Sequence, residues 1–187
     1  MFRVRVLGRE NLPDGGAVLA GNHISYGDPV LLWCAMRRPL HFMAKSELWS
    51  NPLLAWATPR VWAFPVRRGR SDREAISNAT ELLTRGELVG IFPEGTRNTS
   101  GDATVQGGAA FIAMRAGVPI VPVGIAGTDA IRPRGTRMIR FPRVTMSLGQ
   151  PVSAEEFAEA GRKERIEAMT AETMRRITVE LERARRL

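Results

Sequence analysis

His23 and Asp28, in the stretch "GNHISYGDP", are the residues whose types and spacing best suit acid–base chemistry. A neutral imidazole can accept a proton near pH 7, and its usual helper is a carboxylate that fixes its tautomer. Asp28 and Pro29 stand where a helix can start, so Asp28 could fold back toward His23. One interpretation of this spacing is a general base with its orienting carboxylate. The alternative is a turn histidine satisfied by backbone groups, with Asp28 acting only as a helix cap.

No obvious protein nucleophile accompanies this pair. Ser25 is close in sequence, but a serine in a turn is more often a turn former. The single cysteine, Cys34, excludes an internal disulfide and provides no metal-ligand spacing, so we expect no metal site. A histidine and an aspartate without a protein nucleophile fit a scheme in which a hydroxyl on the substrate itself is activated.

Arginines follow predicted strands at two other places. Arg67 and Arg68 lie near the end of "FPVRRG", and Arg97 is the last residue of "FPEGTR". A guanidinium can bind a phosphate group through two parallel hydrogen bonds, which makes these residues candidate phosphate ligands. The alternative is that they are solvated charges on a basic protein.

The stretch "FPEGTR" adds further polar groups beside Arg97. Thr96 and the backbone of Gly95 could donate hydrogen bonds to an anion. Glu94 is interpreted either as an ion-pair partner of Arg97 or as a contact to substrate hydroxyls. A helix N-terminus near such a loop would favour an anion further.

Short apolar runs alternate with amphipathic segments along the chain. Strands are predicted at residues 2–7, 17–21 and 40–45, in a run ending near Val66, and at 88–92, 119–125 and 143–149. Helices are predicted at residues 28–37, in the first part of 49–66, and at 71–86, 105–116 and about 162–186. This alternation predicts an α/β fold, a single domain over residues 1–187 with a central, largely parallel sheet flanked by helices. The three motifs would then meet at the carboxyl ends of the strands.

The composition points to an anionic partner. The chain has 187 residues, 44% of them hydrophobic, and a formal net charge of +8. Such a balance suits a nucleic acid, a membrane surface or a phosphorylated substrate. We expect no nucleic acid, because the arginines follow strands in motifs and are not interleaved with aromatic residues along a strip.

Neither a secretory leader nor a membrane-spanning helix is expected. The stretch "MFRVRVLGRE" alternates apolar residues with arginines, and the chain contains no run of about 18 apolar residues. We therefore expect a cytoplasmic protein that binds the cytoplasmic face of the membrane peripherally. Four tryptophans are interpreted either as core or as an interfacial surface near arginines: Trp33, Trp49, Trp56 and Trp62.

Four blocks of this sequence resemble those of the PlsC-like glycerolipid acyltransferases, the lysophosphatidic acid acyltransferase family. The stretch "NHISYGD" resembles the H-x4-D motif of the family, and "WAFPVRR", "FPEGTR" and "VPIVPVGI" resemble its second, third and fourth blocks. The four blocks stand in order and at the family's spacing, and the likeness covers roughly residues 1–150. The resemblance implies a fold like that of the glycerolipid acyltransferases.

The resemblance also implies an activity, namely acyl transfer from acyl-CoA or acyl carrier protein to the free hydroxyl of lysophosphatidic acid. His23 would take the hydroxyl proton, Asp28 would orient His23, and no acyl-enzyme would form. The acyl thioester is a co-substrate, so no bound cofactor is implied. The implied phosphate and glycerol site comprises Arg67, Arg68, Glu94, Gly95, Thr96 and Arg97, and the implied acyl-chain site comprises Val121, Pro122 and Val123.

Some positions depart from the family pattern. The second block usually opens with glycine, where this chain has Trp62, and often has an acid where this chain has Arg67. The extra positive charge leaves other acceptors open, such as glycerol 3-phosphate or another lyso-lipid or alcohol. A thioesterase-like hydrolase, in which water replaces the alcohol, is a further alternative.

Overall fold

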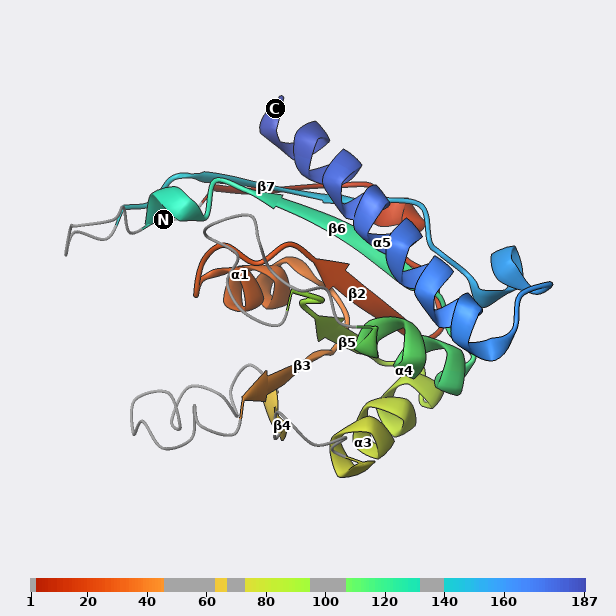
Figure 1. The fold of residues 1–187 in the computed structure, drawn as a ribbon. Coiled ribbons are helices and arrows are strands. Elements are labelled where there is room, and N and C mark those ends of the chain that lie inside the picture. Colours follow the sequence, from red (N-terminus) through yellow and green to blue (C-terminus); the bar gives the residue numbers. More distant parts are fainter. Residues whose placement is uncertain (1–2, 46–62, 67–72, 95–106, 132–139) are drawn as a thin grey trace.

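A seven-stranded mixed sheet organises the chain (Figure 1). The computed structural model describes residues 3–45, 63–66, 73–94, 107–131 and 140–187. The strands are β1 (Arg3–Leu7), β2 (Ala17–Gly21), β3 (Leu40–Lys45), β4 (Ala63–Val66), β5 (Leu88–Ile91), β6 (Ile120–Ala126) and β7 (Arg143–Leu148). Their order in the sheet is β1-β7-β6-β2-β5-β3-β4. The five strands from β6 to β4 are parallel, whereas β7 runs antiparallel to β6, and β1 runs parallel to β7.

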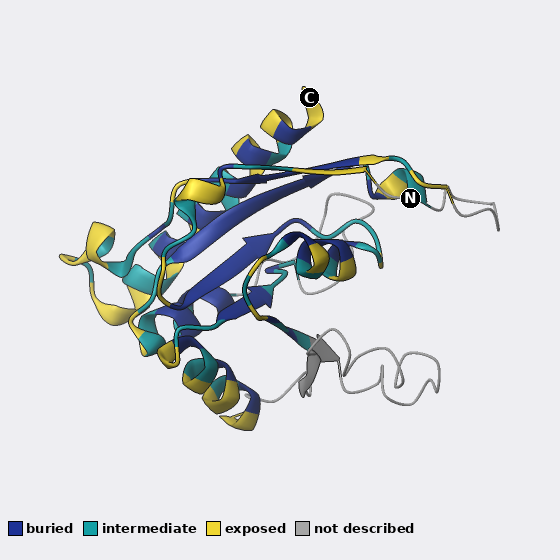
Figure 2. Cartoon of the chain, turned by 180° about the vertical axis from the view of Figure 1, so that it is seen from behind, coloured by how far each residue is buried: buried dark blue, intermediate teal, exposed yellow. Residues whose placement is uncertain are grey.

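Helices cover both faces of this sheet. They are α1 (Asp28–Ala35), α3 (Arg73–Thr84), α4 (Gly108–Ala116) and α5 (Arg162–Arg185), with 3-10 turns at Arg9–Asn11, Asp129–Ile131 and Ala154–Phe157. Along β2, Ala17 and Leu19 pack in the core cluster that contains α1, and Val18 and Ala20 pack in the cluster that contains α3, α4 and α5. Because both faces are covered, the central strands β2 and β6 consist of apolar residues and are buried at every position, as the dark blue of Figure 2 shows. The predicted α/β fold with a largely parallel sheet is confirmed.

Glycines end two of the helices at the predicted places. Gly86, after α3, has a φ of 83°, and Gly117, after α4, has a φ of 66°, a conformation that favours glycine. The predicted helix before Val66 lies outside the described residues. Of the helices in the described ranges, none combines the length and the apolarity that crossing a bilayer requires.

Helix α5 packs on β6 and β7 with a face that differs in part from the predicted one. The sequence places apolar residues along one side of this helix, which predicts that side as the buried one: Ile166, Met169, Met174, Ile177 and Leu181. The buried residues are Met169, Thr173, Ile177, Glu180 and Ala184. Thr173 and Glu180 tolerate burial because each has a hydrogen-bond partner: the Thr173 hydroxyl donates to the carbonyl of Met169, and the Ser147 hydroxyl of β7 donates to the Glu180 carboxylate.

This packing depends on Gly124 in β6. A Cβ atom at Gly124 would lie 2.1 Å from the backbone nitrogen of Leu181 and 2.2 Å from the carbonyl carbon of Glu180. Those neighbours are backbone atoms of α5 and cannot rotate away. Gly124 therefore sets how closely α5 approaches the sheet, and this close approach buries Glu180 in place of a larger apolar residue.

We predict that Gly124→Ala destabilises the protein, because the added methyl group forces α5 away from β6. Overpacking of this kind costs roughly 1–3 kcal/mol. Urea unfolding followed by circular dichroism should show a lower midpoint than wild type. The matched control is Gly108→Ala, because a Cβ atom at Gly108 meets no atom within 4 Å. Equal midpoints for the two variants would contradict this account of the helix–sheet contact.

Candidate active site

The loop between β2 and α1 presents His23 at the carboxyl end of a central strand. Strand β2 ends at Gly21, and α1 begins at Asp28, with Pro29 in its first turn. The loop turns tightly, since the backbone N–H of Asp28 donates to the carbonyl of Ser25 at 3.2 Å. The N–H of Gly27 donates to the Ser25 hydroxyl, also at 3.2 Å. Ser25 therefore acts as a turn former, as its position in the sequence indicates.

His23 and Asp28 are in direct contact. His23 Nδ1 lies 2.9 Å from Asp28 Oδ2, and the same oxygen accepts the backbone N–H groups of Ile24 and Ser25, each at 2.8 Å. Asp28 is fully buried, in the first turn of α1, where the positive end of the helix dipole favours a negative charge. The fold-back expected from the spacing is therefore observed, and the reading of Asp28 as only a helix cap is incomplete.

This contact favours one tautomer of the neutral imidazole. An ionised carboxylate only accepts hydrogen bonds, so in the neutral ring that donates to Asp28 the hydrogen is on Nδ1 and Nε2 keeps its lone pair. The His23 side chain is 17% exposed, whereas that of Asp28 is fully shielded. The arrangement can thus offer an unprotonated nitrogen to a molecule that approaches from outside, with the orienting carboxylate kept away from water.

An aromatic stack supports the imidazole ring. The ring of Phe92, which directly follows β5, stacks on His23 with centroids 4.3 Å apart and an interplanar angle of 21°. Phe42 of β3 continues the stack, 6.0 Å from Phe92. Gly90 makes room for Phe42, because a Cβ atom there would lie 2.4 Å from the Phe42 ring. An aromatic face also interacts favourably with a cation, which suits a histidine that becomes protonated.

Asn22 anchors the residue next to His23. Its side-chain nitrogen donates to the carbonyl of Ile125 at 3.0 Å, and its side-chain oxygen accepts the N–H of Ile125 at 2.7 Å. The register of β2 and β6 pairs Gly21 with Val123, so the buried Asn22 amide continues the strand pairing where the β2 backbone leaves it. Neither Asn22 nor Phe92 is among the site residues predicted from the sequence. A polar residue placed directly after an apolar strand was the available signal for Asn22.

Most of the predicted phosphate ligands lie outside the described residues: Arg67, Arg68, Gly95, Thr96 and Arg97. Glu94 is described and is half-buried, two residues beyond Phe92, which contacts His23. Strands β4 and β5 end at Val66 and Ile91 and run parallel to β2, so both lead toward the edge of the sheet that holds His23. The phosphate-binding role of these residues stays a prediction.

The residues predicted for the acyl-chain site lie in the interior of the sheet. Val121, Pro122 and Val123 belong to β6, and the side chains of both valines are fully buried in the core cluster that contains α1. The structure therefore gives the two valines a packing role, and their part in holding an acyl chain stays a prediction. Trp33 is half-buried against the same cluster, and the other three tryptophans lie outside the described residues.

The second histidine is far from this site along the strands. His41, near the start of β3, contacts the carboxylate of Glu87, which directly precedes β5. This pair lies near the amino ends of strands whose carboxyl ends lead to His23. Within the described ranges, no group of three or more His, Cys, Asp or Glu side chains is placed to hold a metal ion.

Comparison with known proteins identifies a family model and related enzymes that match this chain. A family model described as "Acyltransferase" matches residues 3–126. A 1-acyl-sn-glycerol-3-phosphate acyltransferase of Bacillus subtilis is 36% identical over 176 residues, which are 93% of this chain and 86% of the relative. A lyso-ornithine lipid O-acyltransferase of Pseudomonas aeruginosa is 36% identical over 128 residues, 67% of this chain and 48% of the relative.

A solved structure shares the fold as well. The crystal structure of the 1-acyl-sn-glycerophosphate acyltransferase PlsC from Thermotoga maritima aligns with a TM-score of 0.69 at 28% sequence identity. The alignment covers 95% of this chain and 71% of that one. With the matching family model, the Bacillus relative and this shared fold, the chain belongs to the acyltransferase family and is an enzyme of the O-acyltransferase type.

Proposed function

We propose that this enzyme transfers a fatty acyl group from an acyl thioester, acyl-CoA or acyl carrier protein, to the free hydroxyl of lysophosphatidic acid, giving phosphatidic acid. The observation that carries the proposal is the contact of His23 Nδ1 with a buried Asp28 oxygen that two backbone N–H groups also hold. The choice of acceptor is supported by the Bacillus and Thermotoga relatives, which are 1-acylglycerol-phosphate acyltransferases by name.

In the proposed reaction, His23 acts as a general base toward the acceptor. Nε2 takes the proton from the acceptor hydroxyl while the hydroxyl oxygen attacks the thioester carbonyl carbon. Asp28 stabilises the imidazolium that forms and keeps Nε2 directed away from itself. When the tetrahedral intermediate collapses, the C–S bond breaks and the imidazolium returns the proton to the leaving thiolate. Because the acceptor oxygen attacks directly, this scheme needs no protein nucleophile and no acyl-enzyme.

The acceptor phosphate and glycerol are assigned to the residues after β4 and β5. Guanidinium groups suit a phosphate because they can donate two parallel hydrogen bonds to it. The residues concerned are Arg67, Arg68, Glu94, Gly95, Thr96 and Arg97. Since β4 and β5 both run toward the His23 edge of the sheet, a phosphate held there would lie on the same side as the base.

A second candidate is the same chemistry on another lyso-lipid. The specific observation behind it is the lyso-ornithine lipid O-acyltransferase of Pseudomonas aeruginosa, which matches this chain at 36% identity. The basic Arg67, at a position where the family often has an acid, favours a phosphorylated acceptor. Competition between lysophosphatidic acid, glycerol 3-phosphate and an uncharged lyso-lipid separates the candidates.

The test of the proposed function is thiol release from long-chain acyl-CoA, measured with and without lysophosphatidic acid. We expect release that depends on the acceptor in wild type and that falls by about 10²–10⁴ in His23→Ala, the range for loss of a general base. The control is His41→Gln, which changes the other histidine and should keep its turnover. Release that ignores the acceptor would indicate a hydrolase, and turnover retained in His23→Ala would contradict the role of the base.

We predict that Asn22→Ala lowers kcat at least about tenfold with little change in KM, because His23 loses its anchored neighbour. The change leaves the buried N–H and C=O of Ile125 without their side-chain partner, so the free energy of unfolding should also fall, by about 1–3 kcal/mol. Steady-state kinetics measured well below the melting temperature separate the loss of kcat from the loss of stability, because the variant is then still folded. Asn78→Ala, at an exposed position of α3, is the matched control. A wild-type kcat in Asn22→Ala would show that this anchor has no part in catalysis.

We predict that Arg97→Ala raises KM for lysophosphatidic acid at least about tenfold, since a charge-assisted pair with the phosphate is lost. The KM for an acceptor without a phosphate group should change little. Arg115→Ala removes an exposed arginine of α4 and serves as the control. An unchanged KM for the phosphorylated acceptor would remove Arg97 from the phosphate site.

A further inference from the structure

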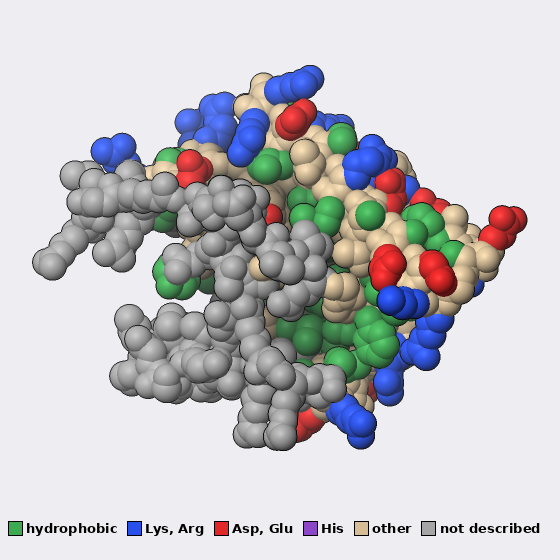
Figure 3. Space-filling model, viewed as in Figure 1, with side chains coloured by type: hydrophobic (Ala, Val, Ile, Leu, Met, Phe, Trp, Pro, Cys, Tyr) green, Lys and Arg blue, Asp and Glu red, His purple; other side chains and the backbone are tan. Residues whose placement is uncertain are grey.

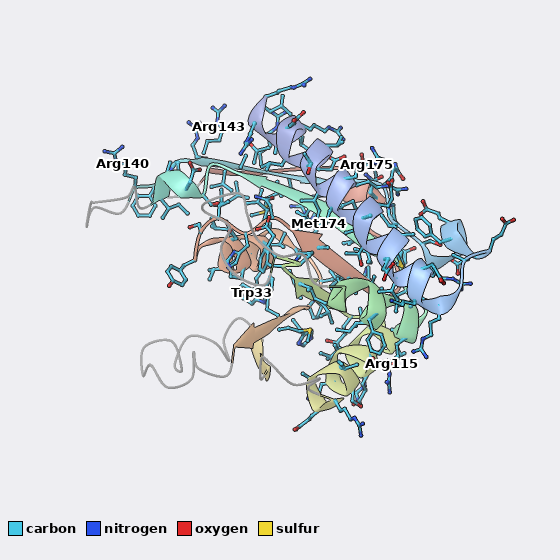
Figure 4. All side chains as sticks on the ribbon, in the orientation of Figure 1. Trp33, Arg115, Arg140, Arg143, Met174 and Arg175 are labelled. Atoms are coloured by element: carbon cyan, nitrogen blue, oxygen red, sulfur yellow. The ribbon has the colours of Figure 1, made fainter. Side chains whose placement is uncertain are left out.

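Four exposed arginines lie along the end of the sheet formed by β1 and β7. They are Arg3 and Arg5 of β1, Arg143 at the start of β7, and Arg140, three residues before it. Figure 4 places Arg140 and Arg143 at the end of the molecule toward which β2 runs and where α1 lies. In the space-filling view, Lys and Arg side chains are visible along the upper side of this end, and others lie over the opposite end (Figure 3). We call these four residues the basic rim.

The basic rim brings like charges together, and in the part of the chain that the structure describes no carboxylate pairs with them. The parallel register of β1 and β7 pairs Arg3 with Arg143, so two positive side chains arise from neighbouring positions of adjacent strands, where like charges repel. Among the described residues, no carboxylate lies within 4.0 Å of any of the four guanidinium groups. Such a cluster is stabilised when an external anion binds to it.

The basic rim is connected to the loop that holds the catalytic pair. The backbone N–H of Arg140 donates to the carbonyl of Ile131 at 2.8 Å. The Ile131 side chain in turn lies against Gly27, where an added Cβ atom would be 2.9 Å from Ile131 Cδ1. Gly27 directly precedes Asp28. Two contacts therefore join Arg140 to the loop between His23 and Asp28.

Exposed aromatic side chains accompany these charges. Phe141 lies between Arg140 and Arg143 and is 58% exposed, and Tyr26, within the loop between His23 and Asp28, is 68% exposed. They are the two most exposed large hydrophobic residues of the described chain. Aromatic residues beside arginines suit the interfacial layer of a bilayer, where rings enter the headgroup region and the cations meet anionic lipids.

We infer that the basic rim, with Phe141 and Tyr26, docks on the surface of an anionic phospholipid bilayer. Docking at this end brings the loop that holds His23 to the lipid, so that the acceptor can reach the base without leaving the membrane for bulk water. This inference rests on the proposed function, because a lyso-lipid acceptor resides in the bilayer. It assigns membrane contact to described residues outside the tryptophan-rich stretch.

The test is co-sedimentation with vesicles of phosphatidylcholine in which about a third of the lipid is phosphatidylglycerol. Arg140→Glu/Arg143→Glu should weaken binding at least about tenfold, since each basic group near an anionic surface contributes on the order of a fivefold factor. The control is Arg115→Glu/Arg162→Glu, which makes the same change in charge between α4 and α5 at the other end of the molecule, where Figure 4 labels Arg115. The control should bind within about twofold of wild type. Phosphatidylcholine vesicles alone should sediment little protein.

Three results would overturn the inference: a wild type that does not sediment with anionic vesicles, a rim variant that binds like wild type, or a control that loses binding equally. Arg140→Gln/Arg143→Gln provides a milder second variant, and circular dichroism confirms that each variant is folded. Turnover of a water-soluble, short-chain lysophosphatidic acid without vesicles should be unchanged in the rim variant. If wild type fails in that soluble assay, the proposed function fails, while the comparison of vesicle binding still decides whether the rim binds lipid.

Discussion

The interaction on which the site depends is the set of three hydrogen bonds accepted by one oxygen of Asp28. A carboxylate removed from water is costly unless donors replace its hydration. Here the backbone N–H groups of Ile24 and Ser25 and the imidazole of His23 do so at Oδ2, whereas the buried Oδ1 has no hydrogen-bond partner among the described residues. The carboxylate of Asp28 holds the loop in this shape, and the loop in turn directs its donors at the buried Oδ2 atom. The same hydrogen bonds therefore fix both the shape of the loop and the position of the His23 ring.

The sheet gives this loop a rigid base. The Asn22 amide holds the end of β2 to Ile125 of β6, and the Phe92 ring at the end of β5 supports the imidazole from its face. Both contacts come from strands that flank β2 directly. Three neighbouring strands thus fix one side chain, which gives a general base the positional precision that catalysis needs.

Much of the scaffold could be predicted from local patterns. Continuous apolar runs marked the buried strands, and Gly86 and Gly117 marked the helix ends, because each of these signals lies within a few residues of its effect. The His23–Asp28 contact was predictable for the same reason, since a helix start brings the two together across four residues.

Other features depend on contacts between distant parts of the chain. Asn22 finds its partner 103 residues away, and the burial of Glu180 follows from the close approach that Gly124 allows. The stack of Phe42 and Phe92 required knowing that β3 and β5 are neighbours. Apolarity alone placed Met174 and Leu181 on the buried side of α5, whereas the residues that packing buries there include Thr173 and Glu180. The local sequence can mark a residue such as Asn22 as a polar residue after a strand, but its partner can be identified only when the order of the strands is known.

The most direct test of the central claim is the tautomer of His23, measured by ¹⁵N NMR of protein labelled at histidine. The chain has only two histidines, so His41→Gln leaves a single imidazole to observe. The account predicts that Nδ1 is protonated and Nε2 is not at neutral pH, and that Asp28→Asn disturbs this state. A wild-type His23 protonated on Nε2 with Nδ1 unprotonated would show that Asp28 does not determine the tautomer of His23. That result would contradict the proposed mechanism.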